Sequence, residues 1–335
     1  MIGDAIRKLT ERQDLAADEA HAAMAEIMSG EAGPAQIAAF LVALRMKGET
    51  VEEVTEFARV MREHVVPVRP TRRPLVDTCG TGGDGLNTFN ISTTAAFVAA
   101  GAGAAVAKHG NRSVSSKCGS ADVLEALGIK VQQSPEEVAR YVGEVGLGFM
   151  FAPAYHPAMK HAMPVRRELA MRTVFNALGP LTNPAGAEAQ VIGVYAPELT
   201  EMHAAVLANL GCRRAFVVHG LDGMDEISTL GATRITELRD GQQRTYELAP
   251  EEVGLKRSLP EEIAGGTPQE NAELLVALLE GKGGAPRDIV LLNAAAAIAA
   301  AGLADTLADG MAHARESIDR GRALGKLRSL QEISA

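Results

Sequence analysis

Cysteine is scarce in this sequence, and its distribution excludes several kinds of site. The 335 residues include three cysteines, Cys79, Cys118 and Cys212, and their spacing is not that of a zinc-ligand cluster. A sparse and odd number of cysteines also provides no disulfide framework. We therefore expect a protein of the reducing cytoplasm.

Long apolar runs and an excess of positive charge are missing as well. The first residues lack a basic region followed by an apolar run, so no signal peptide is expected. Residues 289–304 are the least polar stretch, but they are mostly alanine, contain Asn293 and fall short of the roughly 20 strongly apolar residues of a membrane span. A buried helix is expected there instead. The formal net charge of −9 argues against nucleic acid as the main partner.

The pattern of apolar residues changes near residue 70. With 47% hydrophobic residues, the chain is long enough for two domains or one large α/β domain. Up to that point apolar residues recur at helical spacing, as in Ile37, Phe40, Leu41 and Leu44. Residues 67–74 then contain three prolines, which are typical of a hinge or linker.

After this hinge, short apolar segments alternate with helical ones. We expect strands at residues 75–76, 104–107, 149–152, 191–195 and 215–218. This alternation predicts a largely parallel sheet covered by helices. Residues 234–238 and 244–248, joined around Asp240 and Gly241, predict a peripheral hairpin.

A glycine-rich loop follows the first expected strand. Residues 77–85 read Asp-Thr-Cys-Gly-Thr-Gly-Gly-Asp-Gly, with four glycines among the last six positions. Glycines permit positive φ angles and let backbone amides converge on a phosphate. The loop has neither the lysine of a Walker A sequence nor the spacing of a dinucleotide fingerprint. By itself it is consistent with a phosphate cradle or with a tight turn that binds nothing.

Two neighbouring segments favour an anion. Residues 90–94, Asn-Ile-Ser-Thr-Thr, begin an apolar helix with small hydroxyl residues, which either cap the helix or face a phosphate at its amino end. Residues 108–120 place three cations among glycine and hydroxyl residues, which suits a polyphosphate, although most basic loops are merely solvated. Both segments follow or adjoin strands, so we expect one cleft at the sheet edge.

An acidic pair and an arginine complete the set of candidate residues. Asp225 and Glu226 follow the last expected parallel strand; beside polyphosphate loops, such carboxylates are typical Mg²⁺ ligands. Arg166 lies early in a helix expected to end at residue 178, where it is a surface charge or a bidentate carboxylate binder.

In this order and context, these segments closely resemble the anthranilate phosphoribosyltransferases. The resemblance rests on residues 79–84, 90–93, 108–116 with Ser120, the helix of Arg166, residues 176–184 and Asp225-Glu226, and it extends over nearly the whole chain. It implies a nucleoside phosphorylase/phosphoribosyltransferase-like α/β fold. In that fold a helical domain, residues 1–70 with a helical excursion near 168–188, is joined to a larger domain, residues 74–335, with a mainly parallel sheet. It also implies a homodimer formed through the helical domain.

The resemblance further assigns residues to the two substrates and the metal. Phosphoribosyl pyrophosphate would be held by Gly80, Gly83, Asp84, Thr88, Asn90, Ile91, Ser92, Thr93, Lys108, His109, Gly110, Asn111, Arg112, Ser113, Val114, Ser115, Ser116 and Ser120. Anthranilate would contact Gly80, Asn111 and Arg166, and Mg²⁺ would involve Ser92, Asp225 and Glu226. His109 and His156 either line the path of anthranilate or pack against their neighbours.

Two other functions remain as alternatives. A pyrimidine nucleoside phosphorylase resembles this fold, but its phosphate loop differs from residues 80–84 of this chain. A non-catalytic relative that binds nucleic acid would lose the anthranilate-contacting positions and gain basic surface. Here Asn111 and Arg166 are present and the net charge is −9.

Overall fold

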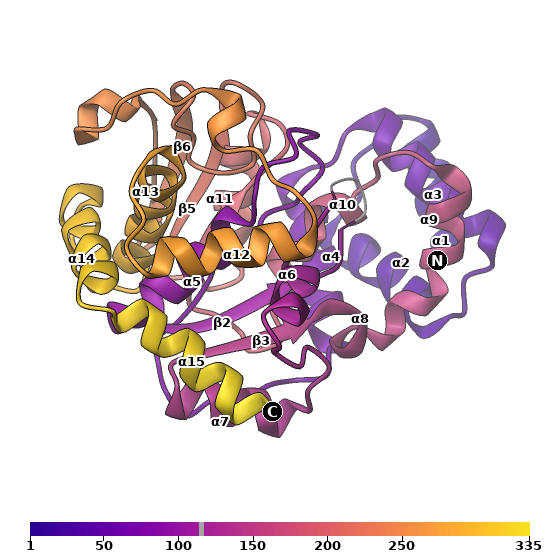
Figure 1. Ribbon diagram of the computed structural model, residues 1–335. Coiled ribbons are helices and arrows are strands. Elements are labelled where there is room, and N and C mark those ends of the chain that lie inside the picture. Colours follow the sequence, from indigo (N-terminus) through magenta and orange to yellow (C-terminus); the bar gives the residue numbers. More distant parts are fainter. Residues whose placement is uncertain (114–116) are drawn as a thin grey trace.

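The computed structural model describes residues 1–113 and 117–335. It consists of a helical part and a larger α/β part built on a seven-stranded sheet. In Figure 1 the N-terminal helices, in indigo, lie to one side of the sheet together with α9 (Met163–Leu169). The fold class expected from the sequence is therefore confirmed.

Four helices make up the N-terminal part. They are α1 (Ile2–Thr10), α2 (Ala17–Ser29), α3 (Pro34–Lys47) and α4 (Val51–Glu63). The start of α4 is a capping box, in which the Glu53 amide donates to Thr50 Oγ1 (3.2 Å) and the Thr50 amide donates to Glu53 Oε2 (2.8 Å). Their apolar faces meet in a core that continues onto one face of the sheet. Because this core is shared, the domain limits 1–70 and 74–335 stay a prediction.

The sheet has the order β3-β2-β1-β4-β5-β6-β7. Its strands are β1 (Leu75–Asp77), β2 (Ala105–Gly110), β3 (Leu147–Phe151), β4 (Ala189–Gly193), β5 (Arg214–Gly220), β6 (Thr233–Arg239) and β7 (Gln242–Leu248). The first five are mutually parallel and the last two antiparallel, as the sequence predicted for the parallel sheet and for the hairpin. The chain runs from β1 to β2 and β3 on one side and returns to β4 on the other. The strand order therefore reverses between β1 and β4, which is where open α/β sheets bind ligands.

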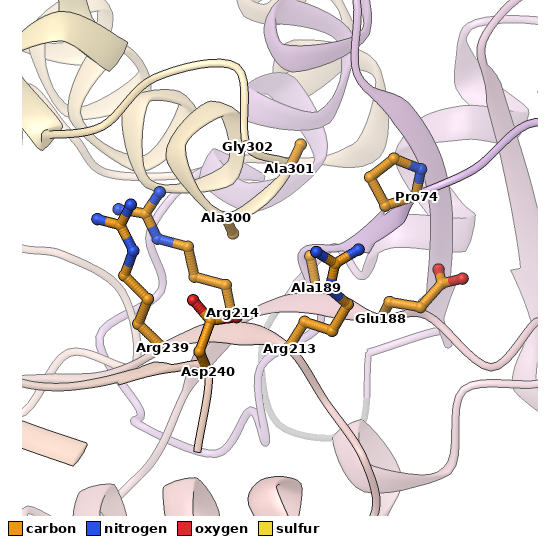
Figure 2. A pocket seen from close by; sticks show the side chains of 10 residues that line it. All are labelled: Pro74, Glu188, Ala189, Arg213, Arg214, Arg239, Asp240, Ala300, Ala301 and Gly302. Carbon is orange, nitrogen blue, oxygen red and sulfur yellow. The ribbon is translucent and has the colours of Figure 1, made fainter. Parts of the chain in front are cut away.

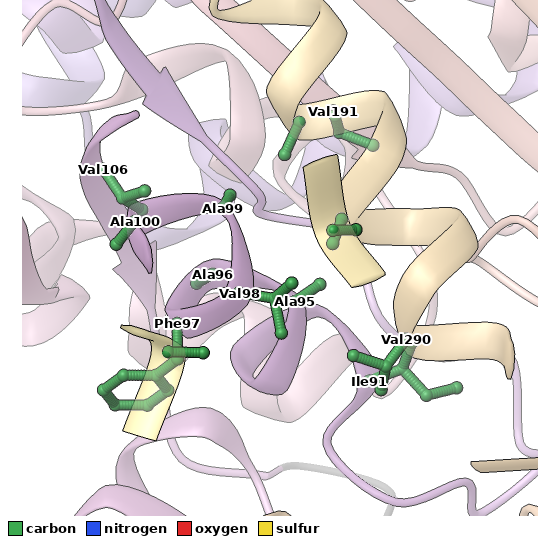
Figure 3. Close-up of a cluster of buried hydrophobic side chains, with 14 of the residues drawn as sticks. Ile91, Ala95, Ala96, Phe97, Val98, Ala99, Ala100, Val106, Val191 and Val290 are labelled. Atoms are coloured by element: carbon green, nitrogen blue, oxygen red, sulfur yellow. The ribbon is translucent and has the colours of Figure 1, made fainter. Parts of the chain in front are cut away.

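Helices cover both faces of the sheet. On one face α5 (Ile91–Gly101) and α13 (Ala285–Ala300) contact the strands. Outside them, α12 (Pro268–Leu279), α14 (Leu307–Asp319) and α15 (Arg322–Ser334) pack on α5, and α6 (Ser120–Ala126) packs on α12. On the other face α7 (Pro135–Glu144) and α11 (Leu199–Asn209) contact the strands, and α4 packs on α11. Figure 3 shows side chains of α5 that belong to one buried cluster with Val106, Val191 and Val290. Residues 289–300 are the buried helix that the alanine-rich stretch predicted, and no helix of the described residues is long and apolar enough to span a membrane.

Several predicted boundaries were wrong. Ala104 precedes β2, and Val194 and Tyr195 follow the end of β4 at Gly193. Ala152 does not extend β3 but begins the short helix α8 (Ala152–Tyr155). The expected helix from Arg166 to residue 178 is interrupted at Ala170, whose φ of 47° lies in the left-handed region, and it resumes as α10 (Phe175–Leu178). The excursion near 168–188 is therefore helical only in part. The remaining helical turns are the short 3₁₀ helices η1 (Pro157–His161), η2 (Gly179–Thr182), η3 (Pro250–Val253) and η4 (Pro260–Glu262).

Candidate active site

The carboxyl ends of β1, β2, β4 and β5 bring the predicted loops together. The contacts are too close for side chains: a Cβ on Gly193 would lie 1.5 Å from the carbonyl oxygen of Asp225, and a Cβ on Gly80 would lie 2.9 Å from Asp225 Oδ2. Glycine at both positions therefore lets the acidic loop after β5 sit directly on the ends of β1 and β4.

The glycine loop is anchored to the acidic loop and to β4. The amide of Thr81 donates to the Gly193 carbonyl (2.8 Å), and the amide of Gly82 donates to Asp225 Oδ2 (2.7 Å). Gly82 and Gly83 have φ angles of 67° and 83°, conformations that residues with a Cβ rarely adopt. Glycine is thus needed here for the path of the backbone as well as for space.

The start of α5 faces the same loop, but its hydroxyl residues do not cap the helix. Thr94 Oγ1 donates back to the Asn90 carbonyl (2.9 Å), while Asn90 Nδ2 donates to the Cys118 carbonyl (3.2 Å). The Ser92 amide donates instead to Glu226 Oε1 (3.1 Å). Of the two alternatives, capping by these hydroxyl residues is not observed, because Glu226 in the loop after β5 accepts from the Ser92 amide.

Four other predicted residues belong to the same region, at the start of α5 or in the segment before it. Ile91 and Thr93 are buried in the first turn of α5, and Thr88 pairs with Ala264 in an isolated bridge. Asp84 lies close enough to Asp225 to affect its pKa.

Lys108 occupies the centre of this arrangement. It is 3% exposed, and its Nζ donates to the Thr78 carbonyl (2.6 Å), to Thr78 Oγ1 (3.2 Å) and to Ser92 Oγ (3.4 Å). The ammonium group therefore joins the end of β1 to the start of α5. Its charge lies beside the acidic pair and opposes the raised pKa of Glu226.

Asp225 and Glu226 are two adjacent acids whose ionisation is disfavoured by their surroundings. Burial and the nearby Asp84 raise the pKa of Asp225 well above its usual range, and burial followed by Asp225 raises the pKa of Glu226 to about 8. Removal from water and like charge both disfavour two adjacent carboxylates. A cation would relieve both effects.

A hollow of about 10 Å³ lies beside Glu226, lined also by Thr78, Gly80, Ser92 and Asn293. This is the volume of about one water molecule or small ion. The donors around it are oxygen atoms, which suit the hard cation Mg²⁺. Ser92 and Glu226, which line the hollow, and the adjacent acid Asp225 have the oxygen ligands that suit the metal implied by the resemblance.

The basic loop is held by α6 in this structure. A Cβ on Gly110 would lie 2.3 Å from Ser120 Oγ, and that hydroxyl donates to the Asn111 carbonyl (3.1 Å). Arg112 does not point to the acidic pair: its guanidinium donates to Glu125 (2.6 and 2.7 Å) and to Asp122 (2.9 Å) on α6. The Ser113 amide also donates to Asp122, at 3.2 Å, whereas Val114, Ser115 and Ser116 lie outside the described residues.

Arg166 is a half-buried cation whose partners are weak. Its Nη1 lies 3.6 Å from the Met163 sulfur, and its guanidinium lies 5.4 Å from the centre of the Phe175 ring. Burial lowers the pKa of this guanidinium. Within residues 1–113 and 117–335 it has no carboxylate at ion-pair distance. An acidic ligand would supply that missing partner.

His109 and His156 form a buried pair with ring centres 5.0 Å apart. Burial, followed by the neighbouring His156, lowers the pKa of His109 to about 3, and burial lowers that of His156 to about 4. Both rings are therefore neutral at physiological pH. The pair links the end of β2 to the residue after α8. Packing is thus part of their role, and a place on the anthranilate path stays a prediction.

Two contributors were missed by the sequence analysis. Arg172, in the break between α9 and α10, donates to the Gly83 carbonyl and lies 4.3 Å from the centre of the Tyr195 ring. Asn293 on α13 accepts from the Ile227 amide (2.9 Å) and donates to the Ile227 carbonyl (2.9 Å), directly after the acidic pair. A lone amide in an alanine-rich stretch was the available signal for Asn293; nothing marked Arg172.

A larger cavity, of about 170 Å³, lies at the opposite, amino edge of the sheet (Figure 2). Arg213, Arg214 and Arg239 line it together with Glu188. Arg214 is occupied by the fold, since it donates to the carbonyls of Ala299 (2.8 Å) and Asp305 (2.7 Å) and so holds the carboxyl end of α13. None of the predicted site residues that the structure describes lines this cavity.

Comparison with known proteins agrees with this arrangement. Residues 72–324 match the family model of the glycosyl transferase family α/β domain, and residues 3–65 match that of its helical bundle domain. The anthranilate phosphoribosyltransferase of Moorella thermoacetica is 58% identical over 330 residues, covering 98% of this chain and 97% of the relative. That of Symbiobacterium thermophilum is 57% identical, covering 98% and 96%.

Solved structures show the same likeness. The anthranilate phosphoribosyltransferase of Thermus thermophilus superposes with a TM-score of 0.94 at 49% identity, covering 98% of this chain and 99% of that one. The enzyme of Saccharomyces cerevisiae in complex with PRPP and Mg superposes with a TM-score of 0.90 at 29% identity, covering 99% and 97%. The sequence, the two-part fold and the loops at the carboxyl edge therefore agree: this chain belongs to the anthranilate phosphoribosyltransferase family.

Proposed function

We propose that this chain transfers the phosphoribosyl group of phosphoribosyl pyrophosphate (PRPP) to the amine of anthranilate and releases pyrophosphate. The observation that carries the proposal is the convergence of the glycine loop, the start of α5, Lys108 and the acidic pair at the β1/β4 switch point. The identity of the relatives supports this transfer rather than the pyrimidine nucleoside phosphorylase reaction.

The pyrophosphate end of PRPP would lie over the glycine loop and the first turn of α5. Backbone amides there, the helix dipole and the Lys108 ammonium all favour a polyanion. Ser92, Asp225 and Glu226 would hold Mg²⁺. The use of this metal is supported by the relative of Saccharomyces cerevisiae, whose structure is a complex with PRPP and Mg. When bound, Mg²⁺ supplies positive charge that stabilises the departing pyrophosphate.

Arg112 and residues 113–116 with Ser120 would complete the PRPP site. Because Arg112 is paired with Asp122 and Glu125 in this structure, its use by substrate requires that these ion pairs break. Its side chain is exposed, so this exchange is inexpensive.

Anthranilate would place its carboxylate at Arg166, with Gly80 and Asn111 as further contacts. Its amine is uncharged at neutral pH, so the reaction does not need a strong general base, and the buried histidines need not provide one. Catalysis then rests on holding the amine against the ribose C1 while the leaving group is stabilised.

The deciding assay follows the loss of anthranilate fluorescence in the presence of protein, PRPP and Mg²⁺. We expect a decrease only when all three are present, with formation of pyrophosphate in equal amount. An unchanged signal from protein that is folded and binds PRPP would contradict anthranilate as the acceptor. Thymidine with phosphate is the matched test of the phosphorylase alternative.

The homodimer and the cytoplasmic location are parts of the same proposal. Met46, 68% exposed at the end of α3, is the kind of apolar side chain that a contact between helical parts would cover. Light scattering during gel filtration should give twice the chain mass of 35.1 kDa, and Met46→Glu should lower it. A single-chain mass for the unaltered protein would contradict the dimer.

A further inference from the structure

Three potential metal ligands gather beside the oxygen-lined site without being part of it. Asp77 ends β1, Cys79 follows two residues later, and His109 lies on the neighbouring strand β2. A carboxylate oxygen, the thiol sulfur and a ring nitrogen of these residues all lie within 4.8 Å of one another. The backbone holds the group together, since the His109 amide donates to Asp77 Oδ1 (3.0 Å).

The His109 ring is the independent sign of a missing ligand. It is 4% exposed, and although the Gly179 backbone is near enough to act on its pKa, neither ring nitrogen has a partner within hydrogen-bond geometry among the described residues. A neutral imidazole always keeps one nitrogen with a free lone pair, and leaving it buried and unpaired is costly. A cation shared with the thiol and the carboxylate would use that lone pair.

The surroundings also favour positive charge. Burial, followed by the neighbouring Asp77, raises the pKa of the Cys79 thiol, and Lys108 opposes this, so an acidic group already lies beside the sulfur that an ion would use. Cys79 is partly accessible, which gives an ion a way in. Asp77 accepts from His109 and from Asn183 Nδ2 (2.7 Å), yet a carboxylate can accept about four such contacts.

We propose that Asp77, Cys79 and His109 form a binding site for a thiophilic divalent cation such as Zn²⁺ or Co²⁺, separate from the Mg²⁺ site. Sulfur and imidazole ligands select these ions over Mg²⁺, which prefers the oxygen atoms of Asp225 and Glu226. On binding, the thiol proton leaves to solvent, a metal–sulfur bond forms, and water completes the coordination. No oxidation or reduction is involved.

Binding would alter the glycine loop. Ligands at about 2.0–2.3 Å from Zn²⁺ lie about 3.5 Å apart in a tetrahedral site, so the three atoms would move together by roughly 1 Å. Cys79 immediately precedes Gly80, whose backbone already contacts Asp225. The ion would thus fix the start of the loop and the His109 ring together, and we expect it to inhibit the enzyme while Mg²⁺ is saturating.

The direct test is absorption spectroscopy of the full chain titrated with Co²⁺ in excess Mg²⁺. We expect a thiolate-to-cobalt charge-transfer band that saturates at one ion per chain. Cys79→Ala should abolish the band, whereas Cys212→Ala, which changes a buried thiol at the other edge of the sheet, should keep it. A band that is absent from the unaltered protein, or unchanged in Cys79→Ala, would overturn the site.

One further measurement needs neither a variant nor the proposed reaction, and a second, which rests on the proposed function, reads inhibition. Zn²⁺ should protect Cys79 of the unaltered protein from alkylation, as read by mass spectrometry, and alkylation at an undiminished rate would count against binding. In assays with saturating Mg²⁺, Cys79→Ala should need roughly 10-fold more Zn²⁺ or more for half inhibition. Equal sensitivity would show that Zn²⁺ acts at another site.

Discussion

Asp225 and Glu226 are adjacent carboxyl groups that accept from backbone amides, with the charge of Lys108 nearby. The Gly82 amide donates to the first and the Ser92 amide to the second. Two amides do not offset the removal of both groups from water, so protonation is favoured in the metal-free protein. At the residue scale, the acidic pair is therefore already positioned for a cation, and without a cation its two carboxyl groups ionise less readily.

Protonation of Glu226 gives the metal-free protein a characteristic pH dependence. Since its pKa rises from 4.5 to about 8 on folding, the stability it contributes is fully present below pH 4.5 and is lost as the pH rises through about 8. Relative to Glu226→Gln, the melting temperature of metal-free protein should fall across this range. Mg²⁺ binds the ionised form, so the rise in melting temperature that it causes should grow with pH. Parallel pH profiles for the two proteins would contradict this assignment.

Replacing Asp225 isolates its role in metal binding. Asp225→Asn keeps an oxygen that can accept from Gly82 but removes a charge, so the Mg²⁺ concentration needed for half-maximal activity should rise. Asp240→Asn, in the exposed turn between β6 and β7, is the matched control and should leave it unchanged. An unaltered magnesium titration of Asp225→Asn would remove this residue from the metal site.

Replacing Arg166 should change the KM values of the two substrates differently. Loss of a hydrogen bond to a charged group costs about 1.5–3 kcal/mol, so Arg166→Ala should raise the KM for anthranilate roughly 10- to 150-fold. The KM for PRPP should remain nearly constant. Arg167→Ala alters the exposed neighbouring arginine and should do neither. Equal effects on both substrates would refute the assignment of Arg166 to anthranilate.

At the scale of elements, the strands were the part most readily predicted. In β4 and β5, successive side chains such as Val191 and Ile192 are buried on opposite faces, so both strands appear in sequence as short continuous apolar segments. The break at Ala170 could not be predicted, because alanine favours a helix and adopts a left-handed φ only where tertiary contacts require it. The glycine loop and the acidic pair were found by composition, whereas the contact of Arg172 with Gly83 joins positions 89 residues apart and leaves no local signal.

Helix α13 positions the acidic loop through one side chain. Asn293 pairs with both the amide and the carbonyl of Ile227. Asn293→Leu would leave these buried groups unpaired, at a cost of about 1–3 kcal/mol, and would free the loop that carries Glu226. We expect a higher Mg²⁺ requirement and a lower melting temperature.

A second change on the same helix distinguishes an effect of lower stability from an effect on the position of the acidic loop. Ile298→Val removes one buried methylene at a cost of about 0.5–1.5 kcal/mol without touching the loop. It should lower the melting temperature and leave the magnesium titration as it was. If Ile298→Val shifted the titration as much as Asn293→Leu, the positioning role of Asn293 would be untenable.

At the scale of the whole molecule, the segment after α9 connects the two substrate sites. It begins directly after the helix that carries Arg166 and contacts the glycine loop through Arg172. The guanidinium of Arg172 stacks on the Tyr195 ring. Tyr195 is tied to the same loop, because its amide donates to Thr81 Oγ1 (3.1 Å). The part of the chain proposed to bind anthranilate is thus in direct contact with the part proposed to bind PRPP.

This connection predicts that a change at Arg172 weakens PRPP binding and slows turnover. Arg172→Ala should raise the KM for PRPP and lower kcat, because the loop loses the donor at Gly83 while Arg166 stays in place. Arg172→Lys should restore little, since an ammonium group does not stack on Tyr195 as a planar guanidinium does. Tyr195→Phe keeps the ring and the backbone amide and should behave like the unaltered enzyme. Steady-state kinetics with each substrate varied in turn decides the matter, and normal kinetics for Arg172→Ala would mean that the two sites are not coupled through this segment.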